Sequence, residues 1–121
     1  MPWKIQQTIE DEIKLRIPPR FQLPPDLGEP ISPRVFSSTY FDTEQHRLGQ
    51  LGLTLRKRVE RSHGVWQLKI PSGEYRIELE IDSGSHHIPG QFLGLLTGFF
   101  RNHEPVQLGK IRTWRTGRLI Q

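Results

Sequence analysis

Acidic and basic side chains alternate along residues 8–17, TIEDEIKLRI, where Glu10 and Glu12 are followed by Lys14 and Arg16 at every second position. Successive side chains of a strand point to opposite faces, so these four charges form one row if the stretch is extended. Carboxylates hold hard divalent cations such as Mg²⁺, and lysine and arginine bind phosphate oxygens. The pattern therefore raises the hypothesis of a site for a metal and a polyphosphate.

The same alternation recurs in LTLRKRVER (53–61), VWQLKIP (65–71) and EYRIELEID (74–82). Each stretch puts apolar residues on one face and charged or polar residues on the other. The cations of these faces are Lys14, Arg56, Arg58, Lys69 and Arg76. Short connections bring them together, which concentrates positive potential. The residues alone leave two interpretations open, a ligand-binding face and an ordinary solvated face.

The remaining segments predict how these strands are positioned. Further strands are expected over 35–42 and 106–120, the first strand over 4–17, a helical turn over 43–52, and a helix within 86–104 that begins near Pro89. Residues 20–34 are rich in proline and are expected to be a connection. The predicted class is α+β, mainly antiparallel β, with about six strands and one or two flanking helices. Tyr40 and Phe41 are expected in the core, and His86 and His87 in a solvated loop.

Composition bounds the partners. The chain has 121 residues, with 17 basic and 13 acidic ones and a net charge of +4. This length predicts a single domain over 1–121, and the charge favours anionic partners. Cysteine is absent, which excludes disulfides and thiolate metal sites. No stretch approaches 18 apolar residues, so no membrane partner is expected and the expected location is cytoplasmic.

Taken together, these segments resemble the CYTH domain of the triphosphate tunnel metalloenzyme superfamily, which includes class IV adenylate cyclases and thiamine triphosphatases. Glu10-x-Glu12-x-Lys14 resembles the ExExK signature of that family. YFDTEQHRLGQLGLTLRKR, WQLKIP, YRIELEI and IRTWR resemble its later segments in the same order, and the resemblance extends over residues 5–116. It implies an antiparallel tunnel of eight strands whose polar interior binds a triphosphate with a divalent metal.

The resemblance also implies roles for individual residues. Glu10 and Glu12 would be the catalytic carboxylates. The metal, Mg²⁺ or Mn²⁺, would be held by carboxylates from the set Glu10, Glu12, Glu78 and Glu80. The phosphate ligands would be Lys14, Arg56, Arg58, Lys69, Arg76 and Arg115. The register of the last strand stays open, because Arg112 has the opposite parity to Arg115.

Two departures from the family pattern stand out. The proline-rich segment 18–33 lies where the family usually has a helix. The chain is also expected to be truncated at its C-terminus relative to the family, with about six strands where eight are expected. An unclosed sheet leaves strand edges that invite pairing, so a homodimer or strand exchange is one way to complete the tunnel.

The expected activity is metal-dependent hydrolysis of a triphosphate, or an adenylate cyclase-like reaction. Inorganic triphosphate, thiamine triphosphate and ATP remain open as substrates. One alternative is a non-catalytic module that binds polyphosphate or nucleotide. Another, less favoured, is a basic β-domain that binds the RNA backbone, which would give steep salt dependence.

Overall fold

The fold is built on one antiparallel sheet, and the computed structural model describes residues 5–10, 22 and 24–119. Six strands follow the order β1-β5-β4-β3-β2-β6 across this sheet. Their bounds are Ile5–Glu10 (β1), Glu29–Asp42 (β2), Thr54–Glu60 (β3), His63–Ser72 (β4), Tyr75–Asp82 (β5) and Val106–Leu119 (β6).

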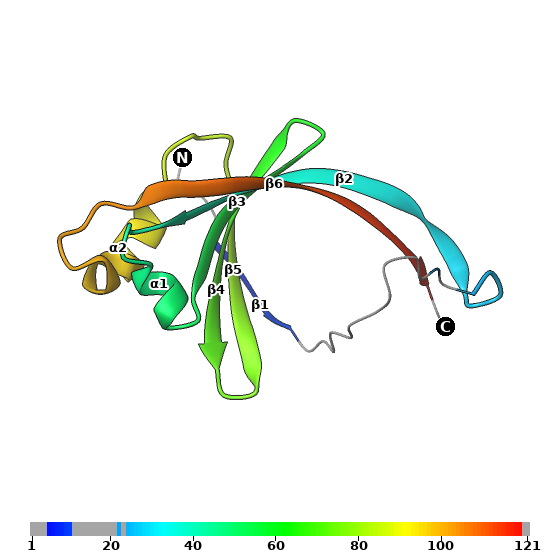
Figure 1. The fold of residues 1–121 in the computed structure, drawn as a ribbon, viewed down its shortest axis with the longest axis horizontal. Helices are drawn as coiled ribbons and strands as arrows, with labels where there is room; N and C mark the ends of the chain where they lie inside the picture. Colours follow the sequence, from blue (N-terminus) through cyan, green and yellow to red (C-terminus); the bar gives the residue numbers. More distant parts are fainter. Residues whose placement is uncertain (1–4, 11–21, 23, 120–121) are drawn as a thin grey trace.

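This arrangement confirms the predicted class of a mainly antiparallel α+β fold with an incomplete barrel. In the described ranges, β1 and β6 are the two edges of the sheet and do not pair with each other, so the sheet is open (Figure 1). The expected first strand is seen over Ile5–Glu10. Its remainder, including Glu12 and Lys14, lies outside the described residues.

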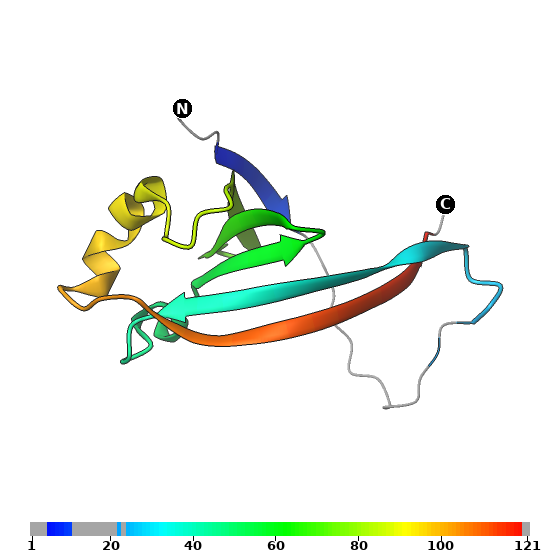
Figure 2. The same ribbon diagram turned by 90° about the horizontal axis from the view of Figure 1, so that it is seen from above.

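Strand β2 begins within the segment expected to be a proline-rich connection, and that prediction is wrong for residues 29–34. Residues 29–36 of β2 are in register with β6, whereas β3 pairs with β2 over Ser37–Phe41. A strand with one free side tolerates proline, because the missing N–H can face that open side. The register also shifts between Ile31 and Arg34. Beyond the end of β3, β2 and β6 therefore continue as a long curved ribbon (Figures 1 and 2).

The β3–β4 turn is tighter than the sequence suggests. Arg61 and Ser62 both have positive φ values, 51° and 64°, and His63 already belongs to β4. Two consecutive left-handed residues match the twist of a two-residue hairpin. The register consequently runs from Glu60–His63 without a break, which places alternate side chains of β3 and β4 on the same face.

Two helices cover one face of the sheet, which we call the helix-side face (Figure 1). They are α1 (Arg47–Gln50) and α2 (Gly90–Phe100). The buried core between helices and sheet consists of Leu48, Leu53, Leu55, Trp66, Leu68, Ile81, Phe92, Leu96 and Phe100. These side chains alternate along the strands with the charged positions, which therefore lie on the opposite face.

Polar contacts fix the segments beside the core. The buried carboxylate of Asp42 accepts backbone N–H groups of Thr43, Leu48 and Gly49 at 2.7–3.0 Å, which holds the start of α1 against β2. In the described ranges, neither helix is long and apolar enough to cross a membrane.

Candidate functional site

The face of the sheet opposite the helices carries the charged side chains, and we call it the polar face. One row crosses it at right angles to the strands. Tyr40, Arg56, Gln67 and Glu80 are register partners on β2, β3, β4 and β5. Cross-strand partners project on the same side of a sheet. Tyr40 therefore lies on the polar face, and its predicted place in the core is wrong; Phe41 does pack against the core, with its ring 5.0 Å from that of Trp66.

Hydrogen bonds connect this row. Gln67 Nε2 donates to Glu80 Oε1 at 2.8 Å, and Arg56 Nε donates to Gln67 Oε1 at 2.6 Å. Arg56 Nη1 also donates to the hydroxyl of Tyr40 at 3.5 Å. Gln67 is buried, so the two bonds fix its amide orientation and hold the Arg56 guanidinium in place. The Gln67 amide thereby bridges Arg56 and Glu80.

Beside this row, three guanidinium groups surround one aromatic ring. The Cζ atoms of Arg58, Arg115 and Arg34 lie 4.2, 5.2 and 5.9 Å from the centroid of the Phe36 ring. Phe36 is buried, with 4% of its surface exposed. The ring attracts each cation, but only weakly compared with a carboxylate. We call Arg34, Arg58 and Arg115 the arginine cluster.

Within the arginine cluster, Arg58 is the residue whose pKa the other arginines lower. Burial lowers the pKa of its guanidinium most, and the positive charges of Arg56, Arg115 and Arg34 lower that pKa further. Glu78 acts in the opposite direction. The Nε atom of Arg58 is buried and has no hydrogen-bond partner among the described residues. An arginine remains charged under these conditions, so this position is short of negative charge and of a hydrogen-bond acceptor.

Arg34 is held differently, by a carboxylate. Its Nε donates to Glu60 Oε2 at 3.0 Å, and its second terminal nitrogen donates to Glu60 Oε1. This bidentate pair raises the pKa of Arg34 and lowers that of Glu60. Because Glu60 ends β3, the pair fastens the β2–β6 ribbon to the rest of the sheet.

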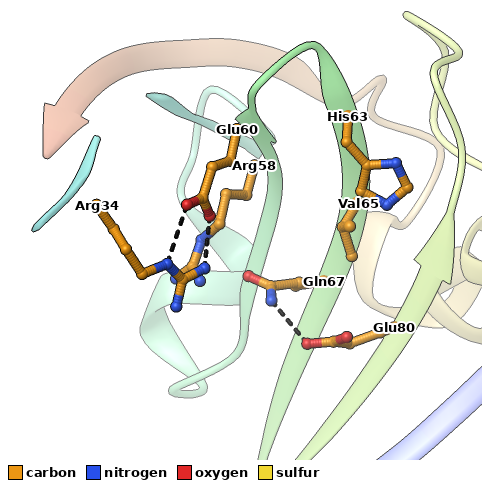
Figure 3. Close-up of a pocket in the computed structure, with 7 residues that line it drawn as sticks. All are labelled: Arg34, Arg58, Glu60, His63, Val65, Gln67 and Glu80. Carbon is orange, nitrogen blue, oxygen red and sulfur yellow. Dashed lines mark hydrogen bonds and ion pairs between the residues drawn. The ribbon is translucent and has the colours of Figure 1, made fainter. Parts of the chain in front are cut away.

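A pocket of about 210 Å³ lies on the polar face, lined by Arg34, Arg58, Glu60, His63, Val65, Gln67 and Glu80 (Figure 3). In Figure 3 the Arg34–Glu60 pair and Arg58 lie on one side of it, and the Gln67–Glu80 pair lies on the other. The lining therefore holds two guanidinium groups and two carboxylates. Arg34 is paired with Glu60, so Arg58 is the cation of this lining that has no carboxylate partner within it.

The structure brings some of the predicted site residues together. Arg58 and Arg115 share the Phe36 ring, and Arg56 is near enough to Arg58 to lower its pKa. The pairing of β6 also defines its register, because Arg115 pairs with Arg34 whereas Arg112 pairs with Ser37 on the helix-side face.

The other predicted site residues lie toward β1. Lys69 is the register partner of Glu78, and Arg76 is exposed and is the register partner of Glu10. Glu12 and Lys14 are outside the described residues. Within the described part of the chain, no group of three or more His, Asp or Glu side chains is placed to hold a metal ion. Glu78 and Glu80 are the described members of the predicted metal set on β5, and they lie on the same strand face.

Sequence reasoning did not single out Arg34, Phe36 or Gln67. The expected connection included Arg34, which hid its alternation with Phe36 and Tyr40 along β2. Extending the expected strand back to residue 34 puts both Arg34 and Phe36 on the charged face. Gln67 stands on the charged face in the sequence, but no local pattern indicates that its amide links Arg56 to Glu80.

The fold resembles that of a solved structure, a protein from Bacillus halodurans described as a "putative adenylate cyclase". The TM-score is 0.56 and the sequence identity 21%. The match covers 69% of this chain and 50% of that chain, so this chain corresponds to about half the length of its structural neighbour. No protein-family model and no curated protein matches the sequence. The structural likeness supports a CYTH-like fold.

Proposed function

We propose that this chain binds a triphosphate-bearing small molecule on its polar face and hydrolyses it with the help of Mg²⁺ or Mn²⁺. The observation that carries the proposal is Arg58, whose buried Nε has no hydrogen-bond partner among the described residues and whose neighbours are further arginines. A polyphosphate in the pocket that Arg58 lines supplies the missing negative charge beside its guanidinium. The similarity to the protein described as a "putative adenylate cyclase" is compatible with a nucleotide or another triphosphate as the ligand.

In this proposal each group of residues has a distinct part. Arg58 binds phosphate oxygens in the pocket, and Arg115 and Arg56, the latter oriented by Gln67, bind them beside it on the polar face. Glu78 and Glu80, with Glu10 and Glu12, would hold the divalent cation, which neutralises phosphate oxygens when bound. Water attacks the terminal phosphorus, the bond to the bridging oxygen breaks, and the neighbouring cations stabilise the charge on the products.

A second candidate is a binding module without catalysis. It is favoured by the arginine cluster around the Phe36 ring, because guanidinium groups bind phosphate oxygens without a metal ion. In this case the polar face holds a polyphosphate or nucleotide, and the carboxylates only set the orientation of the ligand.

The experiment measures phosphate release from inorganic triphosphate with Mg²⁺, with Mn²⁺ and with EDTA, for the unmodified chain, Glu10→Gln and the control Glu104→Gln. Glu104 is exposed and outside the polar face. We expect release that requires metal, that is lost in Glu10→Gln and that is retained in Glu104→Gln. Binding without release in any variant identifies the non-catalytic module.

The binding part of the proposal is tested separately with Arg58→Gln. The loss of a charge-assisted hydrogen bond of about 1.5–3 kcal/mol weakens triphosphate binding roughly ten- to a hundredfold. Arg112→Gln removes the same charge from the helix-side face and serves as the matched control. Equal loss in the two variants would mean that net charge alone attracts the ligand, which contradicts a defined site.

A further inference from the structure

A second pocket lies on the helix-side face, behind the arginine cluster. Its volume is about 220 Å³, and its lining residues are Ser37, Thr39, Phe41, Lys57, Val59, His86, Gln107 and Lys110. They come from three adjacent strands, β2, β3 and β6, and from the loop after β5. None of these lining residues is acidic. The pocket therefore offers ammonium, imidazole, hydroxyl and amide groups with no carboxylate in its lining to neutralise them.

The register explains why two lysines meet here. Thr39 on β2 pairs with Lys57 on one side and with Lys110 on the other. The three residues form a row on one face, and the Cα atoms of the lysines are about 10 Å apart, or two strand spacings. The side chain of Lys110 is long enough to reach over Thr39, whereas the end of the Lys57 side chain lies on the β4 side, next to Gly64.

One of these lysines is fixed in place. Lys57 is buried, and its Nζ donates to the carbonyl oxygen of Gly84 at 3.0 Å. Trp66 Nε1 donates to the carbonyl oxygen of Ser85 at 3.1 Å, so the loop that carries His86 is tied to the sheet at two points. A bond to one carbonyl uses a single proton of an ammonium group that has three. The site is thus built on strands and on a fastened loop.

We propose that this pocket is a second anion site, which binds a small phosphate-bearing molecule through Lys57, Lys110 and His86, with the hydroxyl groups of Ser37 and Thr39 as additional donors. It is separate from the polar face, because its residues project from the opposite side of the same strands. Its ligand-binding groups include neither a metal ligand nor a member of the arginine cluster. The inference therefore holds whether or not the polar face hydrolyses a triphosphate.

The test is an NMR titration of the isotopically labelled chain with inorganic pyrophosphate in the absence of divalent metal. Two sets of amide resonances report on the two faces, Thr39, His86 and Gln107 for this pocket and Phe36, Arg58 and Gln67 for the polar face. We expect the first set to shift with its own dissociation constant. Arg58→Gln should weaken the binding reported by the polar-face resonances and leave the dissociation constant reported by the pocket resonances unchanged.

Lys110→Gln is the main variant, because Lys110 is exposed on an edge strand and holds no other segment in place. We expect Lys110→Gln to raise the dissociation constant of pyrophosphate for the second pocket roughly tenfold. Arg118→Gln, eight residues from Lys110 along β6 and therefore about 27 Å away, leaves the dissociation constant within a factor of two or so of that of the unmodified chain. His86→Gln gives a second, independent weakening.

Three results would overturn the inference. The first is the absence of shifts in the pocket set at millimolar pyrophosphate and physiological ionic strength. The second is equal weakening by Lys110→Gln and Arg118→Gln, which indicates diffuse attraction to a basic surface. The third is that Arg58→Gln changes the dissociation constant reported by the pocket resonances as much as that reported by the polar-face resonances, which would mean that one site alone binds the anion.

Discussion

Replacing Arg58 with methionine should make the unliganded protein as stable as the unmodified chain or slightly more stable, while it impairs anion binding. Arg58 is surrounded by Arg34, Arg56 and Arg115, and burial lowers the pKa of its guanidinium. The carboxylate of Glu78 opposes these effects but does not outweigh them. The Nε of Arg58 is also buried without a partner among the described residues. If Arg58 serves a ligand, as proposed, it does so at some cost in folding free energy.

The size of the effect follows from two opposing terms. A buried donor without an acceptor costs about 1–3 kcal/mol. The contact with the Phe36 ring, 4.2 Å from Cζ to the centroid, returns only about 0.5–1 kcal/mol. Methionine retains packing against the ring through its sulfur. We therefore expect a change in unfolding free energy between zero and about 2 kcal/mol in the stabilising direction, or up to roughly 8 °C in Tm.

The assay is urea unfolding of the unmodified chain, Arg58→Met and Arg112→Met, each with and without inorganic triphosphate. Triphosphate at a hundred times its dissociation constant stabilises the unmodified chain by about 2.7 kcal/mol. If Arg58→Met weakens binding ten- to a hundredfold, that increment should fall to about 0.4–1.4 kcal/mol, and it should remain in Arg112→Met. A loss of more than about 2 kcal/mol in unliganded Arg58→Met would refute the reasoning, since Arg58 would then be a structural residue.

Further predictions concern the groups that position the site. Glu60 has a lowered pKa in the folded state, so its contribution to stability is complete above its ordinary value of 4.5 and is lost as the pH falls through the lowered folded value. Thermal unfolding between pH 6 and about pH 3 should thus show a smaller loss of stability for Glu60→Gln than for the unmodified chain, and equal losses would contradict the ion pair with Arg34. In Gly64→Ala a Cβ would lie 2.7 Å from the carbonyl oxygen of Ser83, and we expect a loss of about 1–3 kcal/mol in urea unfolding. Gly84→Ala, which meets no atom within 4 Å, is the matched control and should be nearly neutral. Asp42→Ala removes the acceptor of three backbone N–H groups and should cost roughly 2–3 kcal/mol, whereas a neutral result in chemical unfolding would show that water replaces the carboxylate.

Much of the polar face is predictable because a strand has a period of two. The alternation around Arg56 and Arg58, and around Glu78 and Glu80, assigns these residues to one face from the sequence alone, and the register of β3, β4 and β5 agrees. Short connections force those strands into a meander. Local sequence is sufficient in this region because both the alternation and the turns depend on neighbouring residues only.

Other features depend on contacts between distant parts of the chain. The strand character of residues 29–34 could not be inferred, because two prolines argue against a strand and only the pairing with β6 overrides them. The arginine cluster requires Arg34 and Arg115, 81 positions apart, to become register partners. The second pocket depends on the same pairing, since it brings Lys110 beside Thr39 and Lys57.

The sequence by itself therefore determined which residues alternate and which face is charged, and it raised polyphosphate binding as a hypothesis. Tertiary structure alone decided which cations meet around Phe36, which of them is left without an acceptor, and that lysines gather on the opposite face. The physical reason is that alternation is a property of one strand. The charge density of a site is set by how several strands are paired and registered, and that pairing depends on the whole sheet.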